Sequence, residues 1–179
     1  LDTPSTVVEH AKARVLPPFH REIIFEHVSF HYDSRPALRD VSLTIRFGET
    51  VAHRGVARAL SQIVAPNVKC MQSMLFIKPP KFPGQAWHQD EIYIPTRDRT
   101  LTGGWIALDE ATVENGCLYV IPGSHRDGYL YPQHDHNNPA EFDLTPESYG
   151  FDESAEIPVE CSAGDVIFFN GYLLHRSRK

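Results

Sequence analysis

The chain has 179 residues, a formal net charge of −6 and 41% hydrophobic residues. This size fits one domain, or one domain with a short additional segment, and the apolar content suffices for a core. No basic residue lies between Arg126 and Arg176, whereas seven acidic residues lie between Glu141 and Glu160. The composition therefore argues against a nucleic-acid groove or a polybasic membrane patch. No apolar run approaches the roughly 18 residues of a membrane span.

The cysteine content indicates a reducing environment. Cys70, Cys117 and Cys161 are odd in number and far apart, which favours free thiols in the cytoplasm over a disulfide framework. The chain starts without a methionine and stops at Lys179, directly after an apolar, strand-like run. We therefore expect it to be a fragment of a longer protein.

The first 68 residues predict two strands and a helix. Residues 22–30 and 38–45 alternate apolar and polar side chains, the pattern of half-buried strands. Residues 54–63 have helical spacing of their apolar side chains.

From residue 69 onward the pattern becomes mainly β. Seven apolar or alternating runs predict strands, at Cys70–Ile77, Trp87–Ile94, Gly104–Leu108, Cys117–Ile121, Ala155–Glu160, Val166–Asn170 and Tyr172–His175. Asn115-Gly116 between two of these runs predicts a hairpin with a type I′ turn. Residues 126–155 form a long segment rich in Asp, Asn, Pro and Gly, and a loop of this length is usually functional or mobile.

A candidate metal centre begins at His88-Gln89-Asp90. On a strand, residues i and i+2 point to the same face, so His88 and Asp90 can supply an imidazole and a carboxylate side by side. His175, at the end of another apolar run, can supply a second imidazole. Two histidines and one carboxylate with three open positions are typical of non-haem Fe(II) oxygenases, whereas structural zinc takes four closed ligands.

Two other histidine pairs compete with this pattern. His125-Arg-Asp127 follows a Pro-Gly-Ser turn, and His134-Asp-His136 lies in an Asn- and Pro-rich loop. We therefore expect both at the surface, or in contact with a metal ligand rather than with the metal. From spacing alone, a metal site at His88 and a plain structural role remain equally open.

The N-terminal part resembles a different family. The run IIFEHVSFHYDSRPALRDVSLTIRFGETVA is similar to the start of an ABC exporter nucleotide-binding domain. The resemblance implies that Tyr32 stacks on adenine, and the alternative is an ordinary strand aromatic. The phosphate-binding pattern GxxxxGK[ST] is missing after it, so we do not expect ATP chemistry.

The rest of the chain resembles another family through four motifs: LFIKPP at 75–80, WHQDEIYI at 87–94, WIALDEATVENGCLYVIPGSHR at 105–126 and AGDVIFFNGYLLHRS at 163–177. Residues 54–179 thereby resemble the phytanoyl-CoA dioxygenase family. The resemblance implies a mainly β fold, a double-stranded β-helix or cupin-like jelly-roll barrel. It also implies Fe(II), 2-oxoglutarate and O₂, and hydroxylation of an unactivated C–H bond in a small organic or acyl substrate.

The resemblance also implies roles for single residues. His88, Asp90 and His175 would be the iron ligands and catalytic centre. Ser177 would hydrogen-bond the 2-oxoglutarate carboxylate, and Trp105 would lie beside this co-substrate. Related halogenases have a small residue in place of the carboxylate, so the presence of Asp90 argues against halogenation.

The sequence departs from the family at both ends. The family has an Arg about eleven residues after the distal histidine to hold 2-oxoglutarate, and here that position falls beyond Lys179. The ABC-like stretch takes the place of the family's N-terminal elements, which cover the barrel. We therefore expect residues 1–53 to be a non-functional, hairpin-like leader, and residues 54–179 to be a truncated barrel that turns over little. Gln89, Tyr93 and Arg97 could line the substrate mouth or lie on a surface strand edge.

The sequence leaves two alternatives to a dioxygenase. One is a cupin-like metal-binding module without turnover, and the other is an ATP-binding fragment of an ABC transporter. The substrate and the oligomeric state cannot be predicted from these residues.

Overall fold

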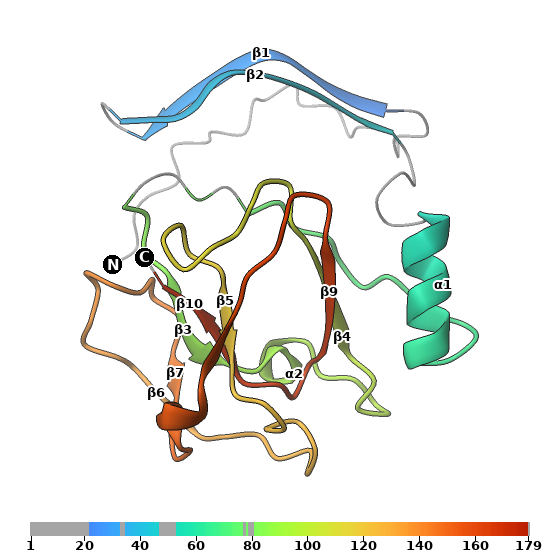
Figure 1. The fold of residues 1–179 in the computed structure, drawn as a ribbon, viewed down its shortest axis with the longest axis vertical. Coiled ribbons are helices and arrows are strands. Elements are labelled where there is room, and N and C mark those ends of the chain that lie inside the picture. The colour runs from blue at the N-terminus through green and yellow to red at the C-terminus, as the bar shows by residue number, and fades with distance from the viewer. Residues whose placement is uncertain (1–21, 33–34, 47–52, 77, 79–80, 179) are drawn as a thin grey trace, which may run out of the picture. The chain divides into compact units, whose positions relative to one another are not determined.

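The computed structural model describes residues 22–32, 35–46, 53–76, 78 and 81–178, and its regular elements are mostly strands (Figure 1). The chain divides into two compact units, which are described separately. One comprises Leu1–Ala59 with Lys69–Ser73, and the other comprises Leu60–Val68 with Met74–Lys179.

The first unit contains a two-stranded antiparallel sheet. Strand β1 (Glu22–Tyr32) pairs with β2 (Arg35–Arg46), which confirms both predicted strands and their hairpin-like arrangement. The register shifts near Val28, where His27 has a positive φ of 50° and its Nδ1 lies 2.7 Å from Asp40 Oδ1. The side chain of Tyr32, which the ABC resemblance placed against adenine, lies outside the described part of the structure.

The segment between the hairpin and the second group of strands is partly as predicted. Helix α1 spans Arg54–Ile63, the predicted range. The strand predicted at Cys70–Ile77 is wrong, because residues 70–76 have no regular secondary structure; Ile77 lies outside the described residues. Met74 and Phe76 are 64% and 65% exposed. Alternation predicts a strand only where a partner covers one face, and no described strand pairs with this run.

A four-stranded antiparallel sheet forms the centre of the second unit. Its order is β3 (Gln85–His88), β10 (His175–Ser177), β5 (Leu118–Val120) and β8 (Ile157–Val159). Segments almost ninety residues apart in the sequence therefore lie side by side, as β3 and β10 do in Figure 1.

Two further strand pairs accompany this sheet. Strand β4 (Thr102–Ile106) pairs with β9 (Val166–Asn170), and the short β6 (Gln133–His134) pairs with β7 (Glu147–Ser148). The 3₁₀ turn η1 covers Glu153–Ala155. Strand β9 has the bounds predicted for it, and β4, β5 and β8 overlap their predicted ranges.

Two predicted strands, Trp87–Ile94 and Tyr172–His175, are wrong in the parts that border the candidate site. The run Trp87–Ile94 leaves the sheet after His88, and helix α2 begins at Asp90 and ends at Tyr93. Acidic side chains in a first helical turn favour this start. The run before His175 is a turn, in which Asn170 Oδ1 accepts a hydrogen bond from the Tyr172 N–H at 2.9 Å.

The hairpin predicted at Asn115-Gly116 is also wrong. Gly116 has the expected positive φ of 90°, but β5 pairs with β10 and β8 rather than with the preceding strand. The Asn115 side chain instead closes a local turn, accepting from the Thr112 N–H and donating to the Glu110 carbonyl, both at 2.7 Å. Its hydrogen-bonding capacity thus serves the loop that precedes β5.

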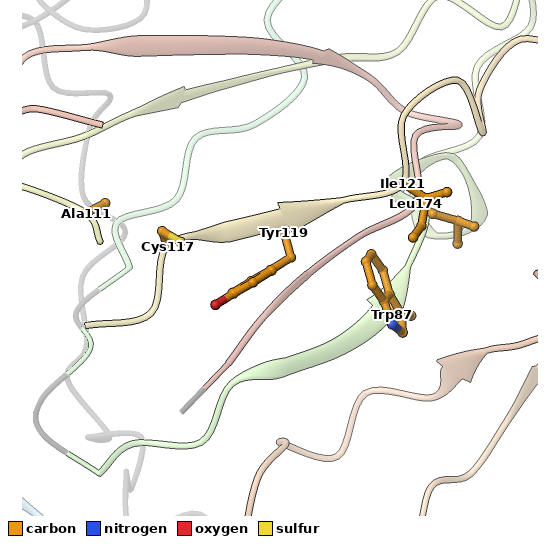
Figure 2. Packing of buried hydrophobic residues seen from close by; sticks show 6 residues of the cluster. All are labelled: Trp87, Ala111, Cys117, Tyr119, Ile121 and Leu174. Atoms are coloured by element: carbon orange, nitrogen blue, oxygen red, sulfur yellow. The ribbon is translucent and has the colours of Figure 1, made fainter. Parts of the chain in front are cut away.

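The core lies against the central sheet. Its buried members, shown in Figure 2, are Trp87, Ala111, Cys117, Tyr119, Ile121 and Leu174. Trp87 and Leu174 are fully buried and directly precede His88 and His175 in the sequence. Because consecutive side chains of a strand point to opposite faces, core packing behind each strand presents its histidine on the other face.

The long segment of residues 126–155 packs onto this core. Phe151 meets Trp87 edge to face at 5.5 Å between ring centroids, and Tyr131 meets Phe151 in the same way at 5.4 Å. Aromatic pairs of this geometry add to the stabilisation that burial provides. The segment therefore forms part of the domain around the candidate site.

Candidate metal centre

The structure brings together His88, Asp90 and His175. One donor atom from each lies within 4.8 Å of the others, and no other group of this kind occurs among the described residues. Nε2 of His88 is 3.8 Å and Nε2 of His175 is 3.7 Å from the same Asp90 oxygen, Oδ1. Both histidines are buried, and the Asp90 side chain is 30% exposed.

Strand pairing places the two histidines. His88 and His175 are direct partners across the antiparallel strands β3 and β10, so their side chains lie on the same face. Their ring centroids are 4.1 Å apart. Gln89 keeps an extended backbone, with φ −131° and ψ 123°, so Asp90 follows on the side of His88 even though α2 begins there. The prediction from the i, i+2 spacing thus holds without a continuous strand.

Backbone carbonyls fix the protonation of both rings. Nδ1 of His88 lies 2.8 Å from the Ala86 carbonyl, and Nδ1 of His175 lies 2.9 Å from the Leu173 carbonyl. A carbonyl only accepts, so in each ring Nδ1 carries the hydrogen and Nε2 keeps its lone pair. This arrangement is the usual one for histidines that bind metals.

Burial keeps the histidines neutral. It lowers the pKa of His175 to about 4, and burial together with the neighbouring His175 lowers the pKa of His88 to about 4. Burial raises the pKa of the Asp90 carboxyl, and the nearby His88 partly offsets this. Two neutral imidazole nitrogens and one carboxylate oxygen meeting at one point fit a divalent transition metal.

The two residues expected beside the metal lie on strands of different sheets. Ser177 is two residues after His175 on β10, and its hydroxyl oxygen accepts a hydrogen bond from the Gln85 N–H at 3.2 Å. Trp105 is in β4, half-buried, and packs against the core cluster. Their roles toward 2-oxoglutarate stay predictions.

The competing histidine pairs do not join the centre. Nδ1 of His134 contacts the carbonyl of Asp135, the adjacent residue, and this side chain is exposed. Nε2 of His136 lies 2.6 Å from the Asp143 carbonyl. His125 is exposed and outside the candidate group.

Gln89 lies in the interior and cannot line the substrate mouth as one interpretation of the sequence proposed. It is fully buried, and its Nε2 donates to the carbonyls of Tyr129 and Tyr172 at 2.9 and 2.6 Å. Its Oε1 accepts from the Tyr131 N–H at 2.8 Å. Gln89 thus joins the segment between His88 and Asp90 to the turn that leads to His175.

Sequence reasoning missed a buried acid next to the centre. Glu91 is 2% exposed, and its Oε1 accepts from the N–H and the hydroxyl of Thr96 at 2.6 and 2.7 Å. Its position directly after Asp90, five residues before a threonine, is the only sequence signal for it. By contrast, Tyr93 and Arg97 are exposed. Tyr93 lies in α2 rather than on a strand edge, and its ring is 6.3 Å from the His88 ring between centroids.

Two buried histidines on an antiparallel sheet and a carboxylate at the start of α2 match the ligand set that is typical of non-haem Fe(II) oxygenases. The sequence model of the family described as phytanoyl-CoA dioxygenase (PhyH) matches residues 8–179, so the chain belongs to this family. The match includes most of residues 1–53, and the comparisons give no support to the ABC exporter resemblance of that part.

Individual relatives agree with this assignment. The chain is 32% identical over 143 residues to phytanoyl-CoA dioxygenase of Arabidopsis thaliana, covering 79% of this chain and 47% of the relative. It is 36% identical over 108 residues to phytanoyl-CoA dioxygenase 1 of Oryza sativa subsp. japonica, covering 60% and 38%. The chain thus spans less than half the length of these relatives.

A solved structure supports the fold. The apo form of ThoJ, a non-haem monooxygenase, aligns with a TM-score of 0.60 and 25% identity over 72% of this chain and 46% of that one. The mainly β architecture and this likeness confirm the predicted jelly-roll class of fold. In the described part of the chain, no helix has the length and apolar character needed to cross a membrane.

Proposed function

We propose that this chain carries the metal centre of a non-haem Fe(II)- and 2-oxoglutarate-dependent oxygenase, with His88, Asp90 and His175 as ligands. The observation that carries the proposal is the convergence of both Nε2 atoms on one Asp90 oxygen. Family membership supports the choice of Fe(II) and 2-oxoglutarate over other metals and co-substrates.

The bound metal would supply the activation of O₂, and the chain supplies geometry and a restricted environment. The carbonyls of Ala86 and Leu173 hold the imidazole rings through their Nδ1 hydrogens. The rings are buried whereas Asp90 is partly exposed, so co-substrates would approach from the side of the carboxylate. Burial of the rings excludes water from the rest of the centre.

We assign Ser177 a role toward the co-substrate. Its hydroxyl oxygen accepts from the Gln85 N–H, which leaves the hydroxyl hydrogen able to donate to a carboxylate. Ser177 alternates with Arg176 and therefore lies on the same face of β10 as His175. We assign it to a carboxylate of 2-oxoglutarate and assign Trp105 to the wall beside it.

The remaining parts of the proposal concern substrate and organisation. We assign a small organic or acyl substrate, a cytoplasmic location consistent with three free cysteines, and a division into residues 1–53 and 54–179. The separate β1–β2 sheet supports this division.

Anaerobic titration with Co(II), followed by a 2-oxoglutarate turnover assay with Fe(II) and O₂, tests the function. We expect one Co(II) site that is lost in His88→Ala and kept in the matched control His134→Ala. We also expect slow CO₂ release that requires 2-oxoglutarate, in keeping with the low turnover predicted from the sequence. Absence of Co(II) binding to the wild-type chain would overturn the proposal. Binding without 2-oxoglutarate-dependent CO₂ release would replace it with a metal-binding module that lacks turnover.

A further inference from the structure

The face of the central sheet opposite the candidate metal centre carries a cluster of aromatic and charged side chains, of which Trp87 and Arg176 are buried. Trp87 precedes His88 on β3, and Arg176 follows His175 on β10, so both point away from the histidines. The guanidinium carbon of Arg176 lies 4.5 Å from the centroid of the Trp87 ring. Trp87 is fully buried and Arg176 is 8% exposed.

Two glutamates balance the charge of Arg176. One guanidinium nitrogen lies 2.5 Å from Glu156 Oε2, and the other lies 3.5 Å from Glu153 Oε2. The same Glu153 oxygen accepts a hydrogen bond from the indole N–H of Trp87 at 3.2 Å. A planar guanidinium that stacks and forms ion pairs at its edge serves both contacts at once, which a lysine ammonium cannot do.

The cluster extends to the other strands of the sheet. Glu156 directly precedes β8, and its second oxygen pairs with Arg178. The guanidinium of Arg178 lies 4.9 Å from the centroid of the Tyr119 ring on β5. The cluster of Trp87, Tyr119, Glu153, Glu156, Arg176 and Arg178 therefore connects β3, β10, β5 and β8.

The backbone pairing of β3 with β10 is short. It has two partner pairs, His175 with His88 and Ser177 with Gln85, and the register shifts between them. A slip of one residue along a strand moves every side chain to the other face, which here would take a histidine away from Asp90. Arg176 and Trp87 are next to His175 and His88 in the sequence and meet on the opposite face of the sheet. A slip would break their contact, so the contact opposes it.

We propose that Arg176, held by Glu156 and stacked on Trp87, is a positioning residue that fixes the register of His88 and His175 for metal binding. The inference rests on the proposed metal-binding function and adds a group that does not touch the metal. Changing a group that hydrogen-bonds a metal ligand typically lowers metal affinity by about 10- to 100-fold. Arg176 holds the two histidines through the strand register rather than through a hydrogen bond. We expect a loss in this range when the Arg176 guanidinium no longer stacks on Trp87 and pairs with Glu156 at the same time.

Arg176→Lys keeps the positive charge and removes the planar guanidinium group. The control Arg97→Lys makes the same change at an exposed side chain paired with Asp98. We expect Arg176→Lys to bind Co(II) about 10- to 100-fold more weakly, with an altered visible d–d spectrum, and Arg97→Lys to match the wild type. Wild-type affinity and an unchanged spectrum in folded Arg176→Lys would overturn the proposal.

A second variant and an NMR measurement complete the test. If Arg176→Lys does not fold, Glu156→Gln removes the charge partner with almost no change of shape, and the same weakening and spectral change are expected. In the metal-free protein, nitrogen NMR of the histidine rings reports whether both Nδ1 hydrogens stay bonded to their carbonyls. We expect that signature to be lost in the variants, and this readout stands even if the wild type binds no metal. Its persistence would contradict the positioning role.

Discussion

His88 and His175 face each other across neighbouring antiparallel strands, with their ring centroids 4.1 Å apart and both Nε2 atoms directed at Asp90 Oδ1. Each ring is fixed by a carbonyl two residues earlier in its own segment. The same local geometry thus occurs twice, once in each strand. This repetition orients both lone pairs before any metal arrives.

The carboxylate of Asp90 is expected to dominate metal affinity. Asp90→Asn keeps the shape of the side chain but removes the negative charge, so Co(II) affinity should fall by more than the about 10- to 100-fold typical of an outer partner. The melting temperature should not fall, because burial disfavours the charged form of the Asp90 carboxyl, as its raised pKa shows, and asparagine carries no charge. Asp127→Asn in the competing His125-Arg-Asp127 motif is the matched control, and equal losses in both variants would contradict the assignment. Calorimetric titration and a melting curve measure both quantities.

The buried histidines should make stability depend on pH. Both have a pKa of about 4 in the folded chain against 6.5 normally. Below pH 6.5 the unfolded chain therefore takes up protons that the folded chain does not. The free energy of unfolding should fall from pH 6.5 towards pH 4, by up to about 1.4 kcal/mol per pH unit for each histidine, with no further contribution from them above pH 6.5.

Urea unfolding of the metal-free protein at several pH values measures this slope. The raised pKa of Asp90 opposes it, so the observed fall should be smaller than the sum of the two histidines. His175→Gln should reduce the slope, whereas His134→Gln, at an exposed position, should leave it unchanged. A slope that is the same in all three proteins would show that the buried histidines are not its source.

The core behind the histidines is expected to set global stability. Leu174 is fully buried directly before His175, whereas Leu144 is 94% exposed. Leu174→Ala removes buried methyl groups and leaves a cavity, which should cost about 2–5 kcal/mol. Leu144→Ala makes the same chemical change at the surface and should have almost no effect. Chemical denaturation of the two variants provides the comparison, and similar midpoints would mean that Leu174 is not part of the core.

Sequence alone could bring His88 and Asp90 together because that signal is local. His88 and Asp90 are two residues apart in an extended run, and alternation suffices to place them together. The pairing of His88 with His175 connects distant segments, and no spacing rule specifies it; the family motif supplied it. The same limit hid the contact of Arg176 with Glu156, because a salt bridge across twenty residues depends on the register of three strands.

The wrong predictions have a common physical cause. The apolar residues of Cys70–Ile77 suit a strand, but they do not show whether a partner strand is present. The strand predicted at Trp87–Ile94 extends past the point where α2 begins, because isoleucine and tyrosine side chains also pack from a helix. Gln89 looked like a surface residue because glutamine is usually exposed, and its burial depends on three backbone partners far along the chain.

Glycine at position 103 is expected to protect the geometry of His175. A Cβ added to Gly103 would lie 2.6 Å from the Phe169 ring, and that ring lies 4.8 Å from the His175 ring between centroids. Gly103→Ala must therefore displace Phe169 and should cost about 1–3 kcal/mol from overpacking. At Gly104 the nearest atom, on the Phe168 ring, would be 3.4 Å away, so Gly104→Ala should be tolerated much better.

Paired measurements on these two variants separate packing from an effect on the centre. Melting temperatures should fall clearly for Gly103→Ala and only slightly for Gly104→Ala. Because Phe169 lies against His175, Co(II) affinity of the folded Gly103→Ala protein should also fall, and that of Gly104→Ala should equal the wild type. A Gly103→Ala protein with lowered stability but unchanged Co(II) affinity would show that Phe169 moves without disturbing His175. Unchanged stability in Gly103→Ala would mean that β4 and β9 separate enough to accept a methyl group, contrary to the packing seen here.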